Sequence, residues 1–265
     1  MTDKIKVVVC GALGKMGLET VRAVQNDEDL ELVGLMDLRG GSGDLALEIG
    51  LGIALPLDID LEIMLTTARP QVMIDFTNPQ SVYRNALTAL SLGINCVVGT
   101  TGLSETELKQ LDDLARQKGV GVAVIPNFAI GAVLMMKMAA EVARYLPDVE
   151  IIEMHHDQKI DAPSGTAIKT AEMIAAARSQ VPVKKIQEIE KIPGARGGDL
   201  KGIKIHSVRL PGFIAHQEVI FGGVGQSLKI RHDSFDRVGF MPGVVMTVKK
   251  VTETQGLIYG LENLL

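Results

Sequence analysis

Short apolar runs alternate with amphipathic stretches along the first half of the chain. The runs are rich in β-branched residues and cover 5–10, 30–36, 72–76, 95–98 and 120–125. After the first run, Leu18, Val21 and Val24 recur at helical spacing among polar residues, and 105–118 is a longer, mostly polar helical stretch. This order of strand, helix and strand predicts an α/β fold, with a parallel sheet and helices on both faces.

The pattern changes near Asn127. Helical periodicity covers 130–146 and 166–177, with a strand-like run at 149–154 between them. Two prolines and a glycine cluster between 181 and 199 predict an exposed loop. Three further apolar runs lie at 203–209, 217–221 and 227–231, and because no long helices separate them they predict an antiparallel sheet. The C-terminal stretch 244–265 is again predicted to be helical. We therefore expect two domains, the second inserted before the last helices of the first.

Charge and composition narrow the classes of partner. The chain has 32 acidic and 27 basic residues, so it offers no global cationic surface to nucleic acid. Aromatic residues make up 3% of the chain and Trp is absent, so there are too few aromatic side chains for a base-stacking surface or a membrane aromatic belt. Charged residues interrupt every apolar stretch before about 18 residues, so neither a signal peptide nor a membrane span is expected. We expect a soluble cytoplasmic protein in which Cys10 and Cys96, both within apolar runs, are buried thiols.

Three glycines at three-residue spacing follow the first predicted strand. Gly11, Gly14 and Gly17 lie where this strand passes into a helix. Glycine at positions 14 and 17 lets the backbone approach a pyrophosphate, and the helix N-terminus supplies N–H groups and the positive end of a dipole. The spacing differs from the usual G-x-G-x-x-G, and a tight turn without any ligand would use the same residues. The turn therefore suggests a dinucleotide site without establishing one.

Residues after the second predicted strand support that hypothesis. Asp37 lies 20 residues after Gly17, where a carboxylate can bind a ribose diol, although a plain strand-end carboxylate fits as well. Lys15 and Arg39 are cations suited to a 2′-phosphate, or solvated surface charges. Asp37 favours NADH and the two cations favour NADPH, so the sequence leaves the choice of cofactor open.

Three later strands end in turns that contain glycine or asparagine, at 76–79, 99–102 and 126–128. Ligands of open parallel sheets bind beyond the carboxyl ends of the strands, so these turns are expected to converge on one crevice. Each turn taken singly also resembles an ordinary loop.

The densest group of titratable residues lies just before the predicted helix at 166–177. Ser164 or Thr166 can cap that helix. The N–H groups of Gly165 and Thr166 then form an anion site to which Lys159 adds a positive charge. These groups suit a small dicarboxylate, and a histidine close to a lysine, here His155, suits general acid catalysis.

Other interpretations of the histidines are weighed beside this one. A zinc site is disfavoured, because His155 and His156 at a strand end point to opposite faces and the usual H-E-x-x-H and C-x-x-C spacings are absent. One solvated and one core histidine would fit the pair as well. The remaining histidines, His206, His216 and His232, lie on strand-like runs and are expected to be structural. The methionine-rich stretch 134–138 is expected to be helix core rather than a binding site.

One segment closely resembles the signature of the 4-hydroxy-tetrahydrodipicolinate reductase (dihydrodipicolinate reductase) family. It reads HHDQKIDAPSGTA at 155–167. The resemblance extends over nearly the whole chain and includes the glycine turn, Phe76-Thr77, 99–102, 126–128, 207–209 and Asp236-Arg237. The histidine–lysine segment is highly specific, whereas the glycine turn alone is not.

The resemblance implies an enzyme that uses NADH or NADPH to reduce a cyclic imine-type dicarboxylate on the diaminopimelate route to lysine. It implies that His155 donates or accepts a proton and that Lys159 is a second proton donor. The substrate carboxylates would be held by His156, Ser164, Gly165, Thr166 and Arg237. The cofactor would be held by Gly11, Ala12, Leu13, Gly14, Lys15, Met16, Gly17, Asp37, Arg39, Gly99, Thr100, Thr101, Ile125, Pro126, Asn127 and Phe128. Some members carry Arg directly after the acidic residue, but Leu38 occupies that position here, which puts a preference for NADPH in doubt.

The resemblance also implies the roles of the two domains. Residues 1–126 and 236–265 would form a Rossmann-like dinucleotide-binding domain. Residues 127–235 would form an α+β domain with a mainly antiparallel sheet, which binds the substrate and builds a homotetramer. No metal, nucleic acid or membrane is implied.

Two other functions fit parts of the sequence. A non-catalytic dinucleotide sensor would use the first domain but would not need the histidine–lysine segment. Another two-domain dehydrogenase, acting on a semialdehyde or a sugar acid, is the other alternative. Its acylating type needs a nucleophilic cysteine, whereas Cys10 and Cys96 lie in apolar runs.

Overall fold

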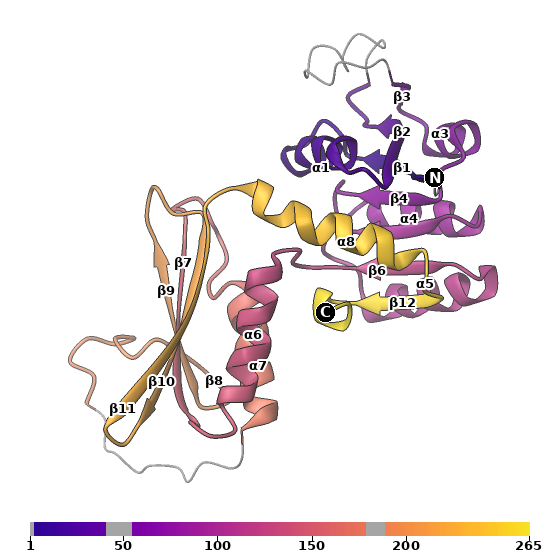
Figure 1. The fold of residues 1–265 in the computed structure, drawn as a ribbon. Coiled ribbons are helices and arrows are strands. Elements are labelled where there is room, and N and C mark those ends of the chain that lie inside the picture. The colour runs from indigo at the N-terminus through magenta and orange to yellow at the C-terminus, as the bar shows by residue number, and fades with distance from the viewer. Residues whose placement is uncertain (1–2, 41–54, 179–188) are drawn as a thin grey trace. The chain divides into compact units, whose positions relative to one another are not determined.

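The computed structural model describes residues 3–40, 55–178 and 189–265, which fold into two compact units (Figure 1). The first unit comprises Met1–Phe128 and Phe240–Leu265, and the second comprises Ala129–Gly239. None of the helices in the described ranges is long and apolar enough to cross a membrane.

A parallel sheet of seven strands forms the centre of the first unit. Its strands run in the order β12-β6-β5-β4-β1-β2-β3, and every neighbouring pair is parallel. Their bounds are β1 (Ile5–Cys10), β2 (Leu30–Met36), β3 (Leu57–Asp58), β4 (Val72–Asp75), β5 (Asn95–Val98), β6 (Gly121–Val124) and β12 (Gly256–Tyr259). Since β1 pairs with β2 on one side and with β4 on the other, the strand order reverses at β1. Ligands of open α/β sheets bind beyond the carboxyl ends of the strands at such a reversal.

Helices cover both faces of this sheet. One face carries α1 (Lys15–Asn26) and α8 (Met241–Val251), and the other carries α3 (Leu61–Ala68), α4 (Val82–Ser91) and α5 (Glu105–Lys118). Alternating strand residues serve the two faces, so that Val8 and Cys10 join the core beneath α3, α4 and α5. A capping box between Ser104 and Glu107 starts α5, in agreement with the predicted helix at 105–118.

A mixed sheet of five strands forms the second unit. Its order is β11-β10-β7-β9-β8, and only the β7–β9 pair is parallel. The strands are β7 (Asp148–His155), β8 (Gly198–Leu200), β9 (Ile203–Arg209), β10 (Ala215–Gly223) and β11 (Gln226–Ser234), and a short 3-10 helix η1 (Arg237–Phe240) follows. Helices α6 (Ile130–Val142) and α7 (Gly165–Ala177) pack side by side on one face, over Val149 and Ile151 of β7. The predicted fold class, a parallel α/β sheet with a second, mainly antiparallel α+β part, is confirmed.

Three details of the sequence interpretation are corrected. Residues 244–265 are not helical throughout, because α8 ends at Val251, Gly256–Tyr259 forms strand β12 and a 3-10 helix η2 (Leu261–Asn263) follows. A strand of four residues is too short to show alternation, and helical periodicity was the stronger pattern around it. Helix α6 ends at Val142 rather than at residue 146. The methionine-rich stretch is only partly core: Met138 is 55% exposed, because consecutive apolar residues on a helix point in different directions.

The exposed loop expected between residues 181 and 199 falls partly outside the described residues. From residue 189 onward it is largely exposed, up to β8.

Candidate functional site

The glycine turn between β1 and α1 contains two glycines required by close backbone packing, Gly11 and Gly17. The third, Gly14, exposes the start of α1. Gly11 has a φ of +74°, and a Cβ there would lie 2.4 Å from the carbonyl oxygen of Phe76. A Cβ at Gly17 would lie 2.0 Å from the carbonyl oxygen of Gly11, so Gly17 serves the packing of α1 on the turn rather than the approach of a ligand. Gly14 is the N-cap of α1, no side chain caps the helix there, and a Cβ would lie 3.1 Å from Gly11 O. The first N–H groups of a helix have no carbonyl partner within it, so this helix start is suited to an anion.

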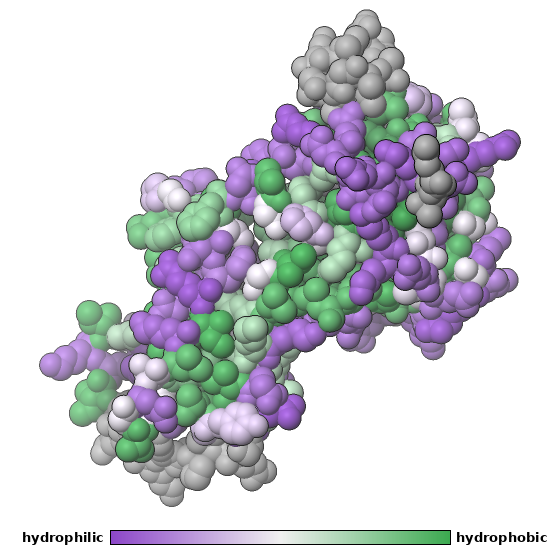
Figure 2. All heavy atoms as spheres, in the orientation of Figure 1, coloured by the Kyte–Doolittle hydropathy of each residue, from purple (hydrophilic) through white to green (hydrophobic). Residues whose placement is uncertain are grey.

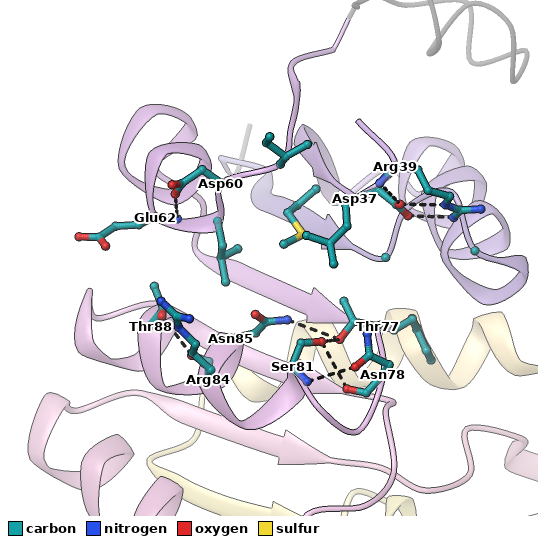
Figure 3. A pocket seen from close by; sticks show the side chains of 17 residues that line it. Asp37, Arg39, Asp60, Glu62, Thr77, Asn78, Ser81, Arg84, Asn85 and Thr88 are labelled. Carbon is teal, nitrogen blue, oxygen red and sulfur yellow. Dashed lines mark hydrogen bonds and ion pairs between the residues drawn. The ribbon is translucent and has the colours of Figure 1, made fainter. Parts of the chain in front are cut away.

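A cavity of about 560 Å³ opens beyond the carboxyl ends of β1, β2 and β4 (Figure 3). Gly11 and Gly14 contribute to its wall, and the residues that follow β2 face those that follow β4 and begin α4. Its other lining residues are Met36, Asp37, Leu38, Arg39, Ile59, Asp60, Leu61, Glu62, Phe76, Thr77, Asn78, Ser81, Arg84, Asn85 and Thr88. Of the predicted cofactor residues, Asp37 and Arg39 therefore lie at the cavity, whereas Lys15 is exposed on α1 and does not line it.

Asp37 connects the glycine turn to the end of β2. Its Oδ2 accepts the N–H of Leu13 at 3.0 Å, and its two oxygens accept the Nε and Nη2 of Arg39 at 2.9 and 3.0 Å. Burial acts to raise the pKa of Asp37, but the hydrogen bonds from Arg39 and Leu13 outweigh it and lower that pKa. Asp37 is therefore a charged acceptor whose partner, Arg39, has a side chain that is 60% exposed.

The three turns predicted to converge do come together. The rings of Phe76 and Phe128, from the first and third turns, have centroids 5.6 Å apart. Gly99 in the second turn lies against the same ring, because a Cβ there would meet Phe76 at 2.0 Å. The turns after β4, β5 and β6 thus share one edge of the sheet.

Asp75, which sequence reasoning missed, joins two of these turns. It is fully buried at the end of β4, and its Oδ1 accepts the Thr77 hydroxyl at 2.7 Å and the Thr100 hydroxyl at 2.8 Å. Its Oδ2 accepts the amide of Asn85 on α4 at 2.8 Å. The sequence signal was a carboxylate directly after the apolar residues of β4, at a position that the sheet buries.

Both cysteines are buried near this carboxylate. Burial and, after it, the negative charge of Asp75 raise the pKa of Cys10 and of Cys96. Thiols held in this protonated form are poor nucleophiles, which disfavours acylating chemistry.

In the second unit, the histidine–lysine segment leaves the sheet at the end of β7. His155 is the last residue of β7, and its Nδ1 lies 2.6 Å from Oε2 of Glu153. His156 follows as an exposed residue outside the strand. Lys159 donates to both carboxylate oxygens of Asp161, at 2.7 and 2.9 Å. The described residues contain no group of three or more potential metal ligands.

Helix α7 begins directly after this segment. Ser164 is its N-cap, and the Ser164 hydroxyl accepts the N–H of Ala167 at 3.2 Å. Gly165 and Thr166 are the first two helical residues, and backbone N–H groups of a helix's first turn point toward its N-terminal end. A Cβ on Gly165 would meet nothing within 4 Å, so the surroundings leave open space at this position. The helix start is therefore accessible to an anion, with the ammonium of Lys159 in the same segment.

The other predicted residues have different surroundings. Arg237 is exposed at the start of η1, and within the described chain no hydrogen bond or ion pair joins it to the histidine–lysine segment. His206 lies 2.8 Å from Glu150, and His216 is buried between the rings of Phe213 and Phe235, as expected for structural histidines.

Comparison with known proteins places the chain in a family. The family models "Dihydrodipicolinate reductase, N-terminus" and "Dihydrodipicolinate reductase, C-terminus" match residues 5–128 and 131–265. The chain belongs to the dihydrodipicolinate reductase family. The C-terminal family model runs across the boundary between the two compact units, since α8 and β12 return to the first unit.

Relatives in this family match along their whole length. The 4-hydroxy-tetrahydrodipicolinate reductase of Syntrophomonas wolfei is 61% identical over 266 residues, covering 100% of both chains. That of Desulfitobacterium hafniense is 52% identical and covers 99% of both. A solved dihydrodipicolinate reductase from Paenisporosarcina sp. TG-14, with dipicolinate bound, is 48% identical, covers 99% of this chain and 100% of its own, and has a TM-score of 0.89.

Proposed function

We propose that this chain catalyses the NADH- or NADPH-dependent reduction of 4-hydroxy-tetrahydrodipicolinate to tetrahydrodipicolinate, on the diaminopimelate route to lysine. The observation that carries the proposal is the 61% identity over the full chain to a 4-hydroxy-tetrahydrodipicolinate reductase. The segment at 155–167 supports it with a histidine, a lysine and an open helix start in one short stretch.

The first unit fits a nicotinamide dinucleotide. The bare helix start at Gly14 suits the pyrophosphate, and Asp37 at the cavity suits a ribose. On the cavity wall, the exposed side chains of Leu38 and Ile59 offer apolar contacts for a base, and Arg84 offers a planar guanidinium. The remaining contacts would come from the rest of the turn and from the two later turns: Gly11, Ala12, Leu13, Lys15, Met16, Gly99, Thr100, Thr101, Ile125, Pro126, Asn127 and Phe128. When bound, the nicotinamide supplies the hydride.

Both cofactors are expected to serve. Arg39 is already paired with Asp37, and its exposed guanidinium can also approach a 2′-phosphate. Each oxygen of Asp37 already accepts two hydrogen bonds, so Asp37 would accept from a free ribose diol once the exposed Arg39 side chain turns away.

The second unit fits a small dicarboxylate. One carboxylate would accept the N–H groups of Gly165 and Thr166 at the start of α7, assisted by Ser164. His156 and Arg237 would contact the second carboxylate. That a relative binds dipicolinate supports a ring carrying two carboxylates.

Proton transfer would involve His155 and Lys159. His155 presents its Nε2 as the exchanging atom, because Nδ1 faces Glu153. Lys159 can turn from Asp161 to the substrate, because this ion pair is largely exposed on the Asp161 side.

Assembly and location are part of the proposal. The face of the five-stranded sheet opposite α6 and α7 is not covered by any helix among the described residues, and apolar residues show on the surface of this unit (Figure 2). We propose a homotetramer built through this sheet, in the cytoplasm. Light scattering on the purified chain should give four times the chain mass.

The activity is tested by following reduced-nicotinamide absorbance while the substrate is generated in the cuvette. Absorbance should fall only when enzyme, substrate and NADH or NADPH are all present. Binding of the dinucleotide without turnover would instead support a sensor.

A further inference from the structure

Glu153 is a buried charge whose position favours an apolar residue. It lies on β7 in line with Val149 and Ile151, on the face covered by the helices, and its side chain has no exposure to solvent. Burying a carboxylate is costly unless charged and hydrogen-bonding partners compensate. The surroundings of Glu153 therefore indicate what its charge does.

Four groups surround the carboxylate. Arg209 on β9 donates to both oxygens, at 2.8 Å to Oε1 and 2.9 Å to Oε2. The backbone N–H of Ser164, at the start of α7, donates to Oε1 at 3.2 Å, and Nδ1 of His155 lies 2.6 Å from Oε2. Burial acts to raise the pKa of Glu153, but hydrogen bonds from His155, Arg209 and Ser207 outweigh it and lower the pKa to about 2. Glu153 is therefore ionised at neutral pH.

An ionised carboxylate can only accept hydrogen bonds. Nδ1 of His155 must then carry the proton that it shares with Glu153, which leaves Nε2 to exchange a proton with another molecule. We propose that Glu153, held by Arg209, is the positioning residue that fixes the tautomer and orientation of His155 and ties the start of α7 to it. This inference rests on the proposed function, which gives His155 its role in proton transfer.

Strand register explains how the groups meet. In the parallel pair β7–β9, Glu153 is opposite Ser207 and His155 is opposite Arg209. All four side chains thus share one face of the sheet. Nη2 of Arg209 also donates to the carbonyl oxygen of Asp161 at 2.7 Å. One ion pair therefore anchors His155, the helix start and the loop that carries Lys159.

The test is Glu153→Gln, read by histidine ring ¹⁵N NMR at a pH where the ring is neutral. A glutamine that keeps its oxygen toward Ser164 turns its NH₂ toward His155, which removes the acceptor for Nδ1–H. The His155 signal is assigned by its absence in His155→Asn. We expect it to show the Nδ1–H tautomer in the wild type and to show that this tautomer no longer predominates in Glu153→Gln. An Nε2–H tautomer in the wild type would overturn the proposal, and this needs neither a variant nor substrate.

Kinetics of the same variant provide the second readout. Outer partners of metal-ligating histidines contribute about 10–100-fold, and on the same scale loss of the Glu153 acceptor should lower kcat at least about tenfold. KM should change less than about threefold, because the glutamine oxygen still accepts from Ser164. A raised KM with unchanged kcat would contradict the positioning role. Absent turnover in the wild type would count against the proposed function instead, while the tautomer measurement would still decide the role of Glu153.

Glu150→Gln is the matched control. Glu150 lies on the same strand, three residues earlier and on the opposite face, and it is also paired with a histidine and an arginine, His206 and Arg196. Because Glu150 lies on the sheet face proposed for assembly, this control is read by the tautomer, and its replacement should leave the His155 tautomer unchanged. Loss of the Nδ1–H tautomer of His155 in Glu150→Gln as well would show that disrupting any glutamate–histidine–arginine cluster on β7 alters His155, and the proposal would fall.

Discussion

Replacing Lys159 with alanine should separate catalysis from folding. The Lys159–Asp161 ion pair joins a side chain that is 21% exposed to one that is 64% exposed. Such solvent-screened pairs contribute about 0.2–1 kcal/mol to stability. The variant should therefore unfold within roughly 1 kcal/mol of the wild type, and its dinucleotide affinity should be unchanged, because the glycine turn belongs to the other unit.

The catalytic loss should be much larger. A positioned acid contributes on the order of 10²–10⁴-fold, so kcat should fall at least roughly 100-fold, which is about 2.7 kcal/mol of barrier. His155→Ala should lose a similar amount. The double variant should lose less than the product of the two, because both groups act on one proton-transfer step.

Steady-state kinetics and thermal unfolding on the same preparations provide the assay. Lys249→Ala is the control: Lys249 is also ion-paired, with Asp27 and Asp29, and its side chain is 35% exposed, but it lies on α8 in the first unit. It should match the wild type in both measurements. A Lys159→Ala enzyme with near-normal kcat and only a raised KM would refute the acid role and leave Lys159 as a carboxylate anchor.

Four further perturbations test other parts of the molecule. Gly14→Val should still fold, because a Cβ there meets only one atom, at 3.1 Å. It should raise the dinucleotide Kd, measured by calorimetry, at least about tenfold, and an unchanged Kd would show that the turn is not part of the cofactor site. Arg39→Ala should penalise NADPH more than NADH, most strongly at low salt, and equal losses would show no contact with the phosphate. Asp75→Ala leaves buried donors unpaired and should lower unfolding stability by about 3 kcal/mol or more in denaturant melts, whereas a loss below about 1 kcal/mol would deny it a joining role. Because the pKa of Glu153 is lowered to about 2, its ionisation stabilises the folded state by roughly 3 kcal/mol at pH values above its ordinary pKa, and this contribution is lost as pH falls toward 2. Glu153→Gln should therefore weaken the loss of unfolding free energy with falling pH, and wild-type and variant stability curves that run parallel from about pH 5 to about pH 2 would contradict the lowered pKa.

Local pattern was sufficient for most of the fold. The apolar runs became strands because each is buried on one or both faces, and the predicted helix at 105–118 has both its capping box and a glycine with left-handed φ at its end. Strand β12 was missed because its four residues form an edge strand only by pairing with β6, far away in the sequence.

The site residues also separate into those that local sequence predicted and those that only the fold brings together. The glycine turn, Asp37 and the histidine–lysine segment are contiguous or near in sequence, so their chemistry could be read directly. Glu153 and Arg209 are 56 residues apart, and Asp75 and Thr100 are 25 apart, so only the strand register brings these pairs together. A carboxylate on the buried face of an apolar strand was the available signal in both cases.

Isotope transfer tests the central claim most directly. The wild-type enzyme is given a reduced cofactor deuterated at the transferred position of the nicotinamide, together with freshly generated 4-hydroxy-tetrahydrodipicolinate, and the product is examined by mass spectrometry. We predict tetrahydrodipicolinate that carries the deuterium, in proportion to the cofactor oxidised. Oxidation of the cofactor with no deuterium in the product, or no oxidation by an enzyme that binds the cofactor, would contradict the assignment of this chain as the reductase.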